Sequence, residues 1–193
     1  MRRSAASALL LAATACGGPA APYASLPADA VVGAGDPTRA AIIGSAYAFG
    51  APDSLAGHPD AVARAVAQVE HLATEIPAGP RWVEFSPLVG QELVAARDEL
   101  RGALGIAPDA PPQAVVDALY GASRALRTGD RAAAGSALGA PVFRNGQATL
   151  ARLSSLPPLP RTRIATSLVN LELNRVDQDG KFSGAGGGDG GKQ

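Results

Sequence analysis

Cysteine and lysine are nearly absent from this chain of 193 residues, which has one cysteine, Cys16, and two lysines, Lys181 and Lys192. A single cysteine excludes a disulfide bond within the chain. The 17 basic residues are balanced by 17 aspartates and glutamates, so the formal net charge is zero. This balance argues against a dedicated nucleic-acid-binding protein, since such proteins need an excess of positive charge to neutralise phosphates. We therefore expect no nucleic-acid partner.

Long hydrophobic runs are also missing. The apolar stretch at residues 8–13 is far shorter than the about 20 residues of a membrane-spanning helix, and no other stretch qualifies, so no transmembrane helix is expected. Glycine (23 residues) and proline (16 residues) make up about a fifth of the chain. That share is below the roughly 25–30% typical of wholly disordered chains, so a folded domain with less ordered ends is expected.

Residues 1–15 have the pattern of a secretory signal peptide. Arg2 and Arg3 give it a positively charged start, and residues 8–13 form a short apolar stretch. Residues 13–15, Ala-Thr-Ala, match the small-residue pattern that signal peptidases cleave. The sequence therefore predicts export across a membrane.

Cys16 follows this cleavage pattern directly, and Ala13-Thr14-Ala15-Cys16 resembles the lipobox of bacterial lipoproteins, with alanine where leucine is usual. The resemblance implies cleavage before Cys16 and attachment of lipid to its thiol. Because Gly17 rather than aspartate follows, it also implies the periplasmic face of the outer membrane. The alternative is cleavage by the general signal peptidase, which would leave a secreted or soluble periplasmic protein. Lipidation also accounts for the single unpaired cysteine.

The rest of the chain predicts an all-α fold. Residues 16–36 are rich in glycine, proline and alanine and are expected to form a flexible tether. Beyond them, prolines mark helix starts, since proline is tolerated at the first helical position. No alternation typical of strands persists, and residues 154–160, Ser-Ser-Leu-Pro-Pro-Leu-Pro, predict a rigid polyproline connector. Helices are expected over residues 37–49, 59–76, 87–104, 112–127, 130–138, 146–155 and 161–173.

We therefore expect a helical bundle of about five to seven short helices over residues 37–175, followed by a disordered glycine-rich tail over 176–193. Within the helix expected at 59–76, the apolar residues gather on one face, and His71 lies opposite them, where solvent is expected. His58 precedes Pro59 and is expected at a helix cap. Neither histidine belongs to a zinc-binding pattern, so no metal is expected.

The loop at residues 77–86 contains the only tryptophan, Trp82, together with Phe85. One interpretation is that both rings fill the end of the bundle core. The other is that they form a surface for a ligand or partner. An apolar ligand could occupy a cavity in the bundle, and the candidate binding residues are Arg81, Trp82, Phe85, Tyr120 and Phe143.

Charge is divided unevenly along the chain. Residues 36–100 contain 4 arginines and 9 acidic residues, whereas residues 101–175 contain 9 arginines and 4 acidic residues. The two halves could neutralise each other across the bundle. The alternative is a basic face for anionic lipid, an envelope polymer or an acidic protein, because the arginine guanidinium binds phosphate and carboxylate through two donors. The candidate residues for this face are Arg124, Arg127, Arg131, Arg144, Arg152, Arg161 and Arg163.

No catalytic motif stands out, and no cofactor is expected. The favoured hypothesis is a non-enzymatic cell-envelope lipoprotein, held to the membrane by its lipid, whose helical bundle binds a protein or an anionic envelope component. The alternative is a periplasmic carrier of an apolar ligand in a bundle cavity. An enzyme would be indicated if Arg81, Glu84 and a histidine converged in a buried site.

Overall fold

The computed structural model describes residues 23–31 and 35–185, with side chains for all of these except Pro52 and 181–185. The described part contains seven α-helices and no strand, so the predicted all-α bundle is confirmed. Three short 3₁₀ turns are η1 (Ala28–Ala30), η2 (Pro52–Leu55) and η3 (Pro80–Trp82). The helices are α1 (Pro37–Gly50), α2 (Pro59–Ala78), α3 (Pro87–Leu104), α4 (Pro112–Arg127), α5 (Arg131–Ala137), α6 (Gly146–Ser154) and α7 (Pro160–Ala185).

Proline and capping residues set the helix starts. Five helices, α1, α2, α3, α4 and α7, begin with proline, whose fixed φ angle suits the first helical position. The Asp36 carboxylate caps α1 by accepting hydrogen bonds from the backbone N–H groups of Thr38 (2.9 Å) and Arg39 (3.2 Å). Gly105 ends α3 in the left-handed conformation at φ 72°. The sequence signals for these boundaries are therefore reliable.

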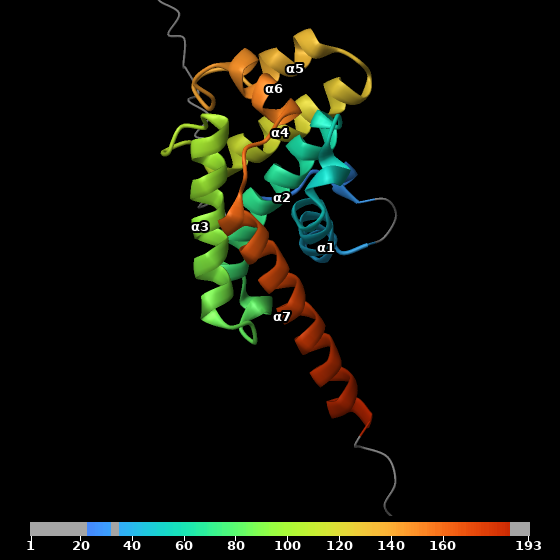
Figure 1. The fold of residues 1–193 in the computed structure, drawn as a ribbon. Helices are drawn as coiled ribbons and strands as arrows, with labels where there is room; N and C mark the ends of the chain where they lie inside the picture. Colours follow the sequence, from blue (N-terminus) through green and yellow to red (C-terminus); the bar gives the residue numbers. More distant parts are fainter. Residues whose placement is uncertain (1–22, 32–34, 186–193) are drawn as a thin grey trace, which may run out of the picture.

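Helix α2 lies at the centre of the bundle and packs against α1, α3, α4 and α6 (Figure 1). Helix α7 packs against both α1 and α3, and its far end extends beyond the body. Helices α4, α5 and α6 gather at the opposite end of the molecule, the upper end in Figure 1.

The central position of α2 overturns the expectation for His71. Its side chain is 4% exposed rather than solvated. The helical-wheel argument assumed that only one face of α2 would be covered, whereas neighbouring elements cover it on several sides. Three other polar side chains of α2 are buried for the same reason: Gln68, Glu70 and Glu75.

Part of the expected tether packs against the body. Residues 23–31, called the strap below, lie against the bundle. Ala24 is 2% exposed, and Leu26 and Ala30 pack against the core. The Ser25 N–H donates to Gln113 Oε1 at 2.7 Å, and Gln113 Nε2 donates to the Ser25 carbonyl at 3.1 Å. The remaining expected tether residues are mostly outside the described part of the chain.

Helix α7 corrects the expected tail. It was predicted to end at residue 173 and continues to Ala185, so the boundary at 176 was wrong. Val176 still packs against the core. Arg39 on α1 donates two hydrogen bonds to the Asp177 carboxylate, at 2.9 and 2.5 Å. These contacts join the first turn after residue 173 to the body, although the composition of this segment alone does not favour a helix. Residues 186–193 are outside the described part.

Candidate functional site

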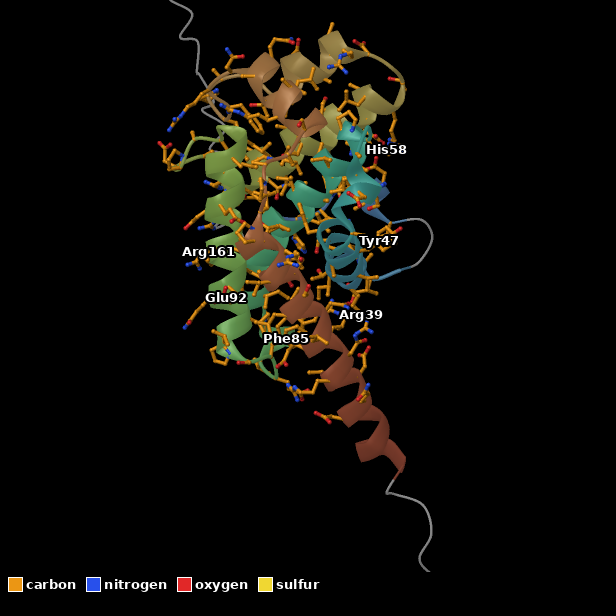
Figure 2. The ribbon with its side chains drawn as sticks, in the orientation of Figure 1. Arg39, Tyr47, His58, Phe85, Glu92 and Arg161 are labelled. Carbon is orange, nitrogen blue, oxygen red and sulfur yellow. The ribbon has the colours of Figure 1, made fainter. Side chains whose placement is uncertain are left out.

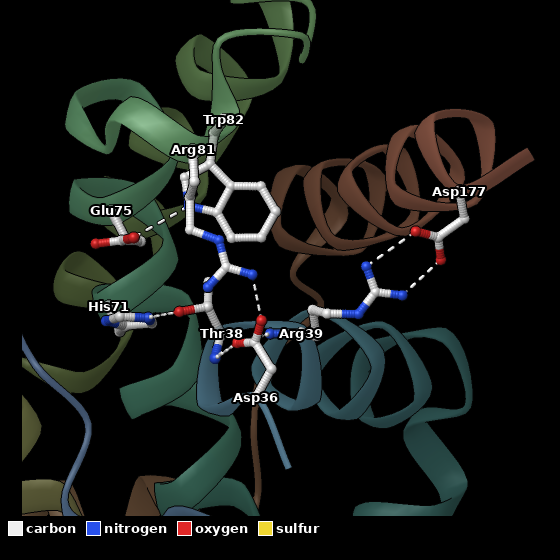
Figure 3. Close-up of polar contacts among 8 residues, drawn as sticks. All are labelled: Asp36, Thr38, Arg39, His71, Glu75, Arg81, Trp82 and Asp177. Carbon is white, nitrogen blue, oxygen red and sulfur yellow. Dashed lines mark hydrogen bonds and ion pairs between the residues drawn. The ribbon is translucent and has the colours of Figure 1, made fainter. Parts of the chain in front are cut away.

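A buried polar network joins the strap to α1 and α2, and Figure 3 shows its contact between His71 and Thr38. His71 Nδ1 lies 2.6 Å from the Ala24 carbonyl oxygen, and His71 Nε2 lies 3.1 Å from Thr38 Oγ1. The Ala24 N–H donates to Thr74 Oγ1 at 3.0 Å. His71 therefore holds three segments that are far apart in the sequence.

The protonation of His71 follows from its partners. A carbonyl oxygen can only accept, so Nδ1 carries the proton and donates to Ala24. Burial lowers the pKa of His71 below its ordinary value, so the ring is neutral at pH 7 and Nε2 accepts from the Thr38 hydroxyl. A hydroxyl bonded to an imidazole can serve nucleophilic catalysis. Here Thr38 is 7% exposed and His71 4% exposed, and neither lines the two grooves described below, so the visible role of this contact is to join α1 to α2.

Trp82 and Phe85 are buried, as the first of the two interpretations of this loop expects. They are 6% and 7% exposed, and their rings meet edge to face with centroids 5.0 Å apart. Trp82 Nε1 donates to Glu75 Oε1 at 3.0 Å (Figure 3). A Cβ atom on Gly79 would lie 2.8 Å from Trp82 Cδ1, so glycine permits the ring to fold back onto α2. The two rings close the lower end of the bundle.

Arg81 covers the Trp82 ring of this pair. Its guanidinium lies 4.4 Å above the Trp82 ring and forms an ion pair with Asp36, the cap of α1 (Figure 3). Glu84 is exposed, and its backbone carbonyl accepts a hydrogen bond from Arg175. Arg81 and Glu84 are thus directed to other partners than His71, and the triad that would indicate an enzyme does not converge.

The five candidate residues for an apolar ligand do not form one site. Arg81, Trp82 and Phe85 lie at the lower end, where Figure 2 labels Phe85 beside α7. Phe143 is fully buried in the α5–α6 loop, where it forms an isolated bridge with Ile106. Tyr120 is buried on α4, beneath Arg124. The expected joint cavity was therefore wrong.

Trp82 and Phe85 do contribute to the wall of a groove of about 530 Å³, without Tyr120 or Phe143. A larger groove, of about 730 Å³, lies elsewhere, between the end of α1, the start of α2 and the link from α6 to α7. Its lining includes residues 153–160, most of which the sequence indicated only as a rigid connector. Sequence reasoning missed this groove because its walls come from segments about 100 residues apart.

The seven candidate arginines are divided into different environments. Arg124 pairs with Asp29 of the strap. Arg161 and Arg163 lie on α7, where Arg163 lines the larger groove and Arg161 lies on the α3 side (Figure 2). The other four are exposed near the end formed by α4, α5 and α6, and none forms an ion pair with a described residue. We call them the arginine cap: Arg127, Arg131, Arg144 and Arg152.

Only one ion pair among the described residues joins the acidic half to the basic half. Arg101 donates to both carboxylate oxygens of Glu70, and the side chains are 8% and 3% exposed. Burial raises the pKa of the Glu70 carboxyl, and the nearby Arg101 guanidinium opposes that shift. Arg101 also donates to three backbone carbonyls of the following loop: Ala107, Pro108 and Ala110. Among the residues that the structure describes, direct ion pairing between the two halves is therefore limited to this buried pair.

The described residues contain no group of three or more histidine, cysteine, aspartate or glutamate side chains that could hold a metal ion. No helix in this same part of the chain is long and apolar enough to cross a membrane.

His58 precedes α2 as its cap, as expected, although its side chain makes no capping hydrogen bond. Cys16 and the signal pattern are outside the described residues.

Comparison with known proteins finds no protein-family model, no curated protein and no solved structure that matches this chain. The arguments about function therefore rest on the residues of this chain and their geometry. Two surfaces have the chemistry of a binding site: the arginine cap and the groove of about 730 Å³.

Proposed function

We propose that the protein is a non-enzymatic cell-envelope lipoprotein, anchored by lipid on Cys16, whose helical body binds an anionic component of the envelope through the arginine cap. The observation that supports this most directly is the set of four exposed arginines that form no ion pair with a described residue. Residues 112–154 contain five arginines and only two acidic residues, Asp117 and Asp130.

The position of the strap implies that a lipid on Cys16 would lie close to the helical body. Seven residue steps separate Cys16 from Tyr23, where the described chain begins. At about 3.3–3.6 Å per residue, these steps span at most about 25 Å. A lipid on Cys16 would therefore hold the body beside the membrane surface. Among the anionic partners considered, lipid headgroups are the one this short connection favours.

Metabolic labelling tests the anchor. Cells expressing the full chain are grown with radioactive or alkyne-tagged palmitate, and the protein is isolated. We expect label on the wild type and none on Cys16→Ser. Ser7→Ala, a change within the signal region that leaves Cys16 in place, is the matched control and keeps the label. An unlabelled wild type, or equal label on Cys16→Ser, contradicts lipidation.

A further inference from the structure

The groove of about 730 Å³ has the size of a small-molecule site, for which about 300–1,000 Å³ is usual. Its floor is formed by three almost fully buried apolar side chains, Phe49, Val62 and Leu153. Partly buried leucines form its walls: Leu55 beside the start of α2, and Leu156 and Leu159 in the link to α7. Most of the contact surface that it offers is therefore aliphatic.

The walls of this groove are poor partners for a peptide. Pro157, Pro158 and Pro160 line it and have no backbone N–H group to donate. A bound peptide would need hydrogen-bond partners for its own backbone, whereas an aliphatic chain needs none. The lining therefore favours a hydrocarbon chain as the buried part of the ligand.

Among the described residues, Arg163 is the only charged one in the lining. It is exposed and forms no ion pair with a described residue. It also lies in the first turn of α7, where the helix dipole adds partial positive charge. No acidic side chain lines the groove in the part of the chain that the structure describes. A carboxylate at the end of the bound chain would therefore meet a guanidinium that can donate two hydrogen bonds to it.

We propose that this groove binds a fatty-acid-like molecule, with its aliphatic chain over Phe49, Val62 and Leu153 and its carboxylate on Arg163. Such a molecule combines the two features that the lining offers, an apolar trough and one cation. The lining of this site includes neither Trp82 and Phe85 nor any arginine of the arginine cap. It goes beyond the proposed function, because it requires neither lipid on Cys16 nor binding to a membrane.

Binding is tested with a fluorescent probe that carries a free carboxylate, 11-(dansylamino)undecanoic acid. The protein is the full chain with Cys16→Ser, so that its own acyl chains cannot compete. We expect the probe to bind in the micromolar range, with dodecanoate displacing it at least about fivefold more effectively than dodecanol, because only the carboxylate pairs with Arg163. Absence of binding, or equal displacement by the two competitors, overturns the proposal.

Two pairs of variants locate the site. A Cβ atom on Gly50 meets nothing within 4 Å, so Gly50→Leu fills the groove, and we expect it to abolish probe binding. Gly102 in α3 is equally open but lies outside the groove, so Gly102→Leu is the control. Arg163→Ala should lower dodecanoate affinity about fivefold and leave dodecanol unchanged. Arg161→Ala, on the same helix, should change neither.

Folding is checked by thermal unfolding of each variant. If Gly50→Leu fails to fold, Ser155→Phe is tested in its place, because Ser155 also lines the groove. Unchanged probe affinity in the folded filling variant overturns the assignment to this groove. Equal dodecanoate affinity in Arg163→Ala and Arg161→Ala overturns the role of Arg163.

Discussion

His71 connects the strap, α1 and α2 through both nitrogens of one ring. This arrangement requires a neutral imidazole, since protonated Nε2 could no longer accept from the Thr38 hydroxyl. Burial disfavours the charged ring and lowers the pKa of His71 below its ordinary value. Protonation therefore costs folding free energy at this residue.

This cost predicts loss of stability in mild acid. As the pH falls below about 6.5, the unfolded chain takes up a proton at His71 before the folded chain does, so the free energy of unfolding decreases. Urea unfolding at pH 7.5 and 5.5 measures the difference. His71→Gln should reduce this dependence, whereas the exposed His58→Gln should preserve it. Identical pH dependence in wild type and His71→Gln would contradict the account.

The buried pair of Glu70 and Arg101 makes a second prediction. Arg101→Met leaves the Glu70 carboxylate buried without its cation, and we expect the free energy of unfolding to fall by about 3 kcal/mol. Adding Glu70→Leu removes the orphaned charge and should restore part of that loss. Chemical denaturation measures both variants. A loss below about 1 kcal/mol in the single variant would show that the pair is not essential.

Among the helices, the boundaries marked by proline could be predicted from the sequence. Starts at residues 37, 59, 87 and 112 are confirmed because a proline ring fixes φ locally. The strap could not be predicted, since its composition is that of a linker. Its partners, Thr74 and Gln113, lie about 50 and 88 residues further along the chain. In α7, the first turn after residue 173 likewise has its partner, Arg39, on another helix.

Contacts between residues that are distant in the sequence also limited the prediction of the candidate sites. The core position of Trp82 and Phe85 was one of two interpretations of a local pattern, and the structure favours it. The groove depends on Gly50 and Leu156 lining the same hollow, although they are about 100 residues apart, and no local sequence pattern indicates that arrangement. A groove formed by segments that are distant in the sequence therefore could not be predicted from local sequence patterns.

Docking of the strap can be tested by hydrogen exchange. Gln113→Ala removes both hydrogen bonds to Ser25, and we expect the amides of residues 23–30 to exchange at least about tenfold faster. The amides of α2 should keep their protection, since its core contacts are unchanged. Gln91→Ala, an exposed glutamine on α3, is the matched control. Unchanged exchange in the strap of Gln113→Ala would contradict the docking.

The whole chain has a formal net charge of zero, but its positive and negative charges are unevenly distributed. One buried ion pair joins its acidic and basic halves among the described residues, and the arginine cap keeps its charge exposed. A basic end on a body with a short connection to a lipid is suited to an anionic membrane surface. Each arginine near such a surface contributes about 1 kcal/mol to binding, and salt screens the attraction.

Flotation with lipid vesicles tests this central claim most directly. The full chain with Cys16→Ser, which has no lipid of its own, is mixed with vesicles that contain phosphatidylglycerol or only phosphatidylcholine. We predict binding to the anionic vesicles alone, weakened by salt. Arg131→Gln with Arg144→Gln should lower the affinity about 30-fold, at about 1 kcal/mol for each arginine.

The matched control replaces two exposed arginines outside the cap, Arg64→Gln with Arg161→Gln, and should retain most of the binding. Equal affinity for both kinds of vesicle, or equal loss in the two double variants, would contradict a membrane-binding arginine cap.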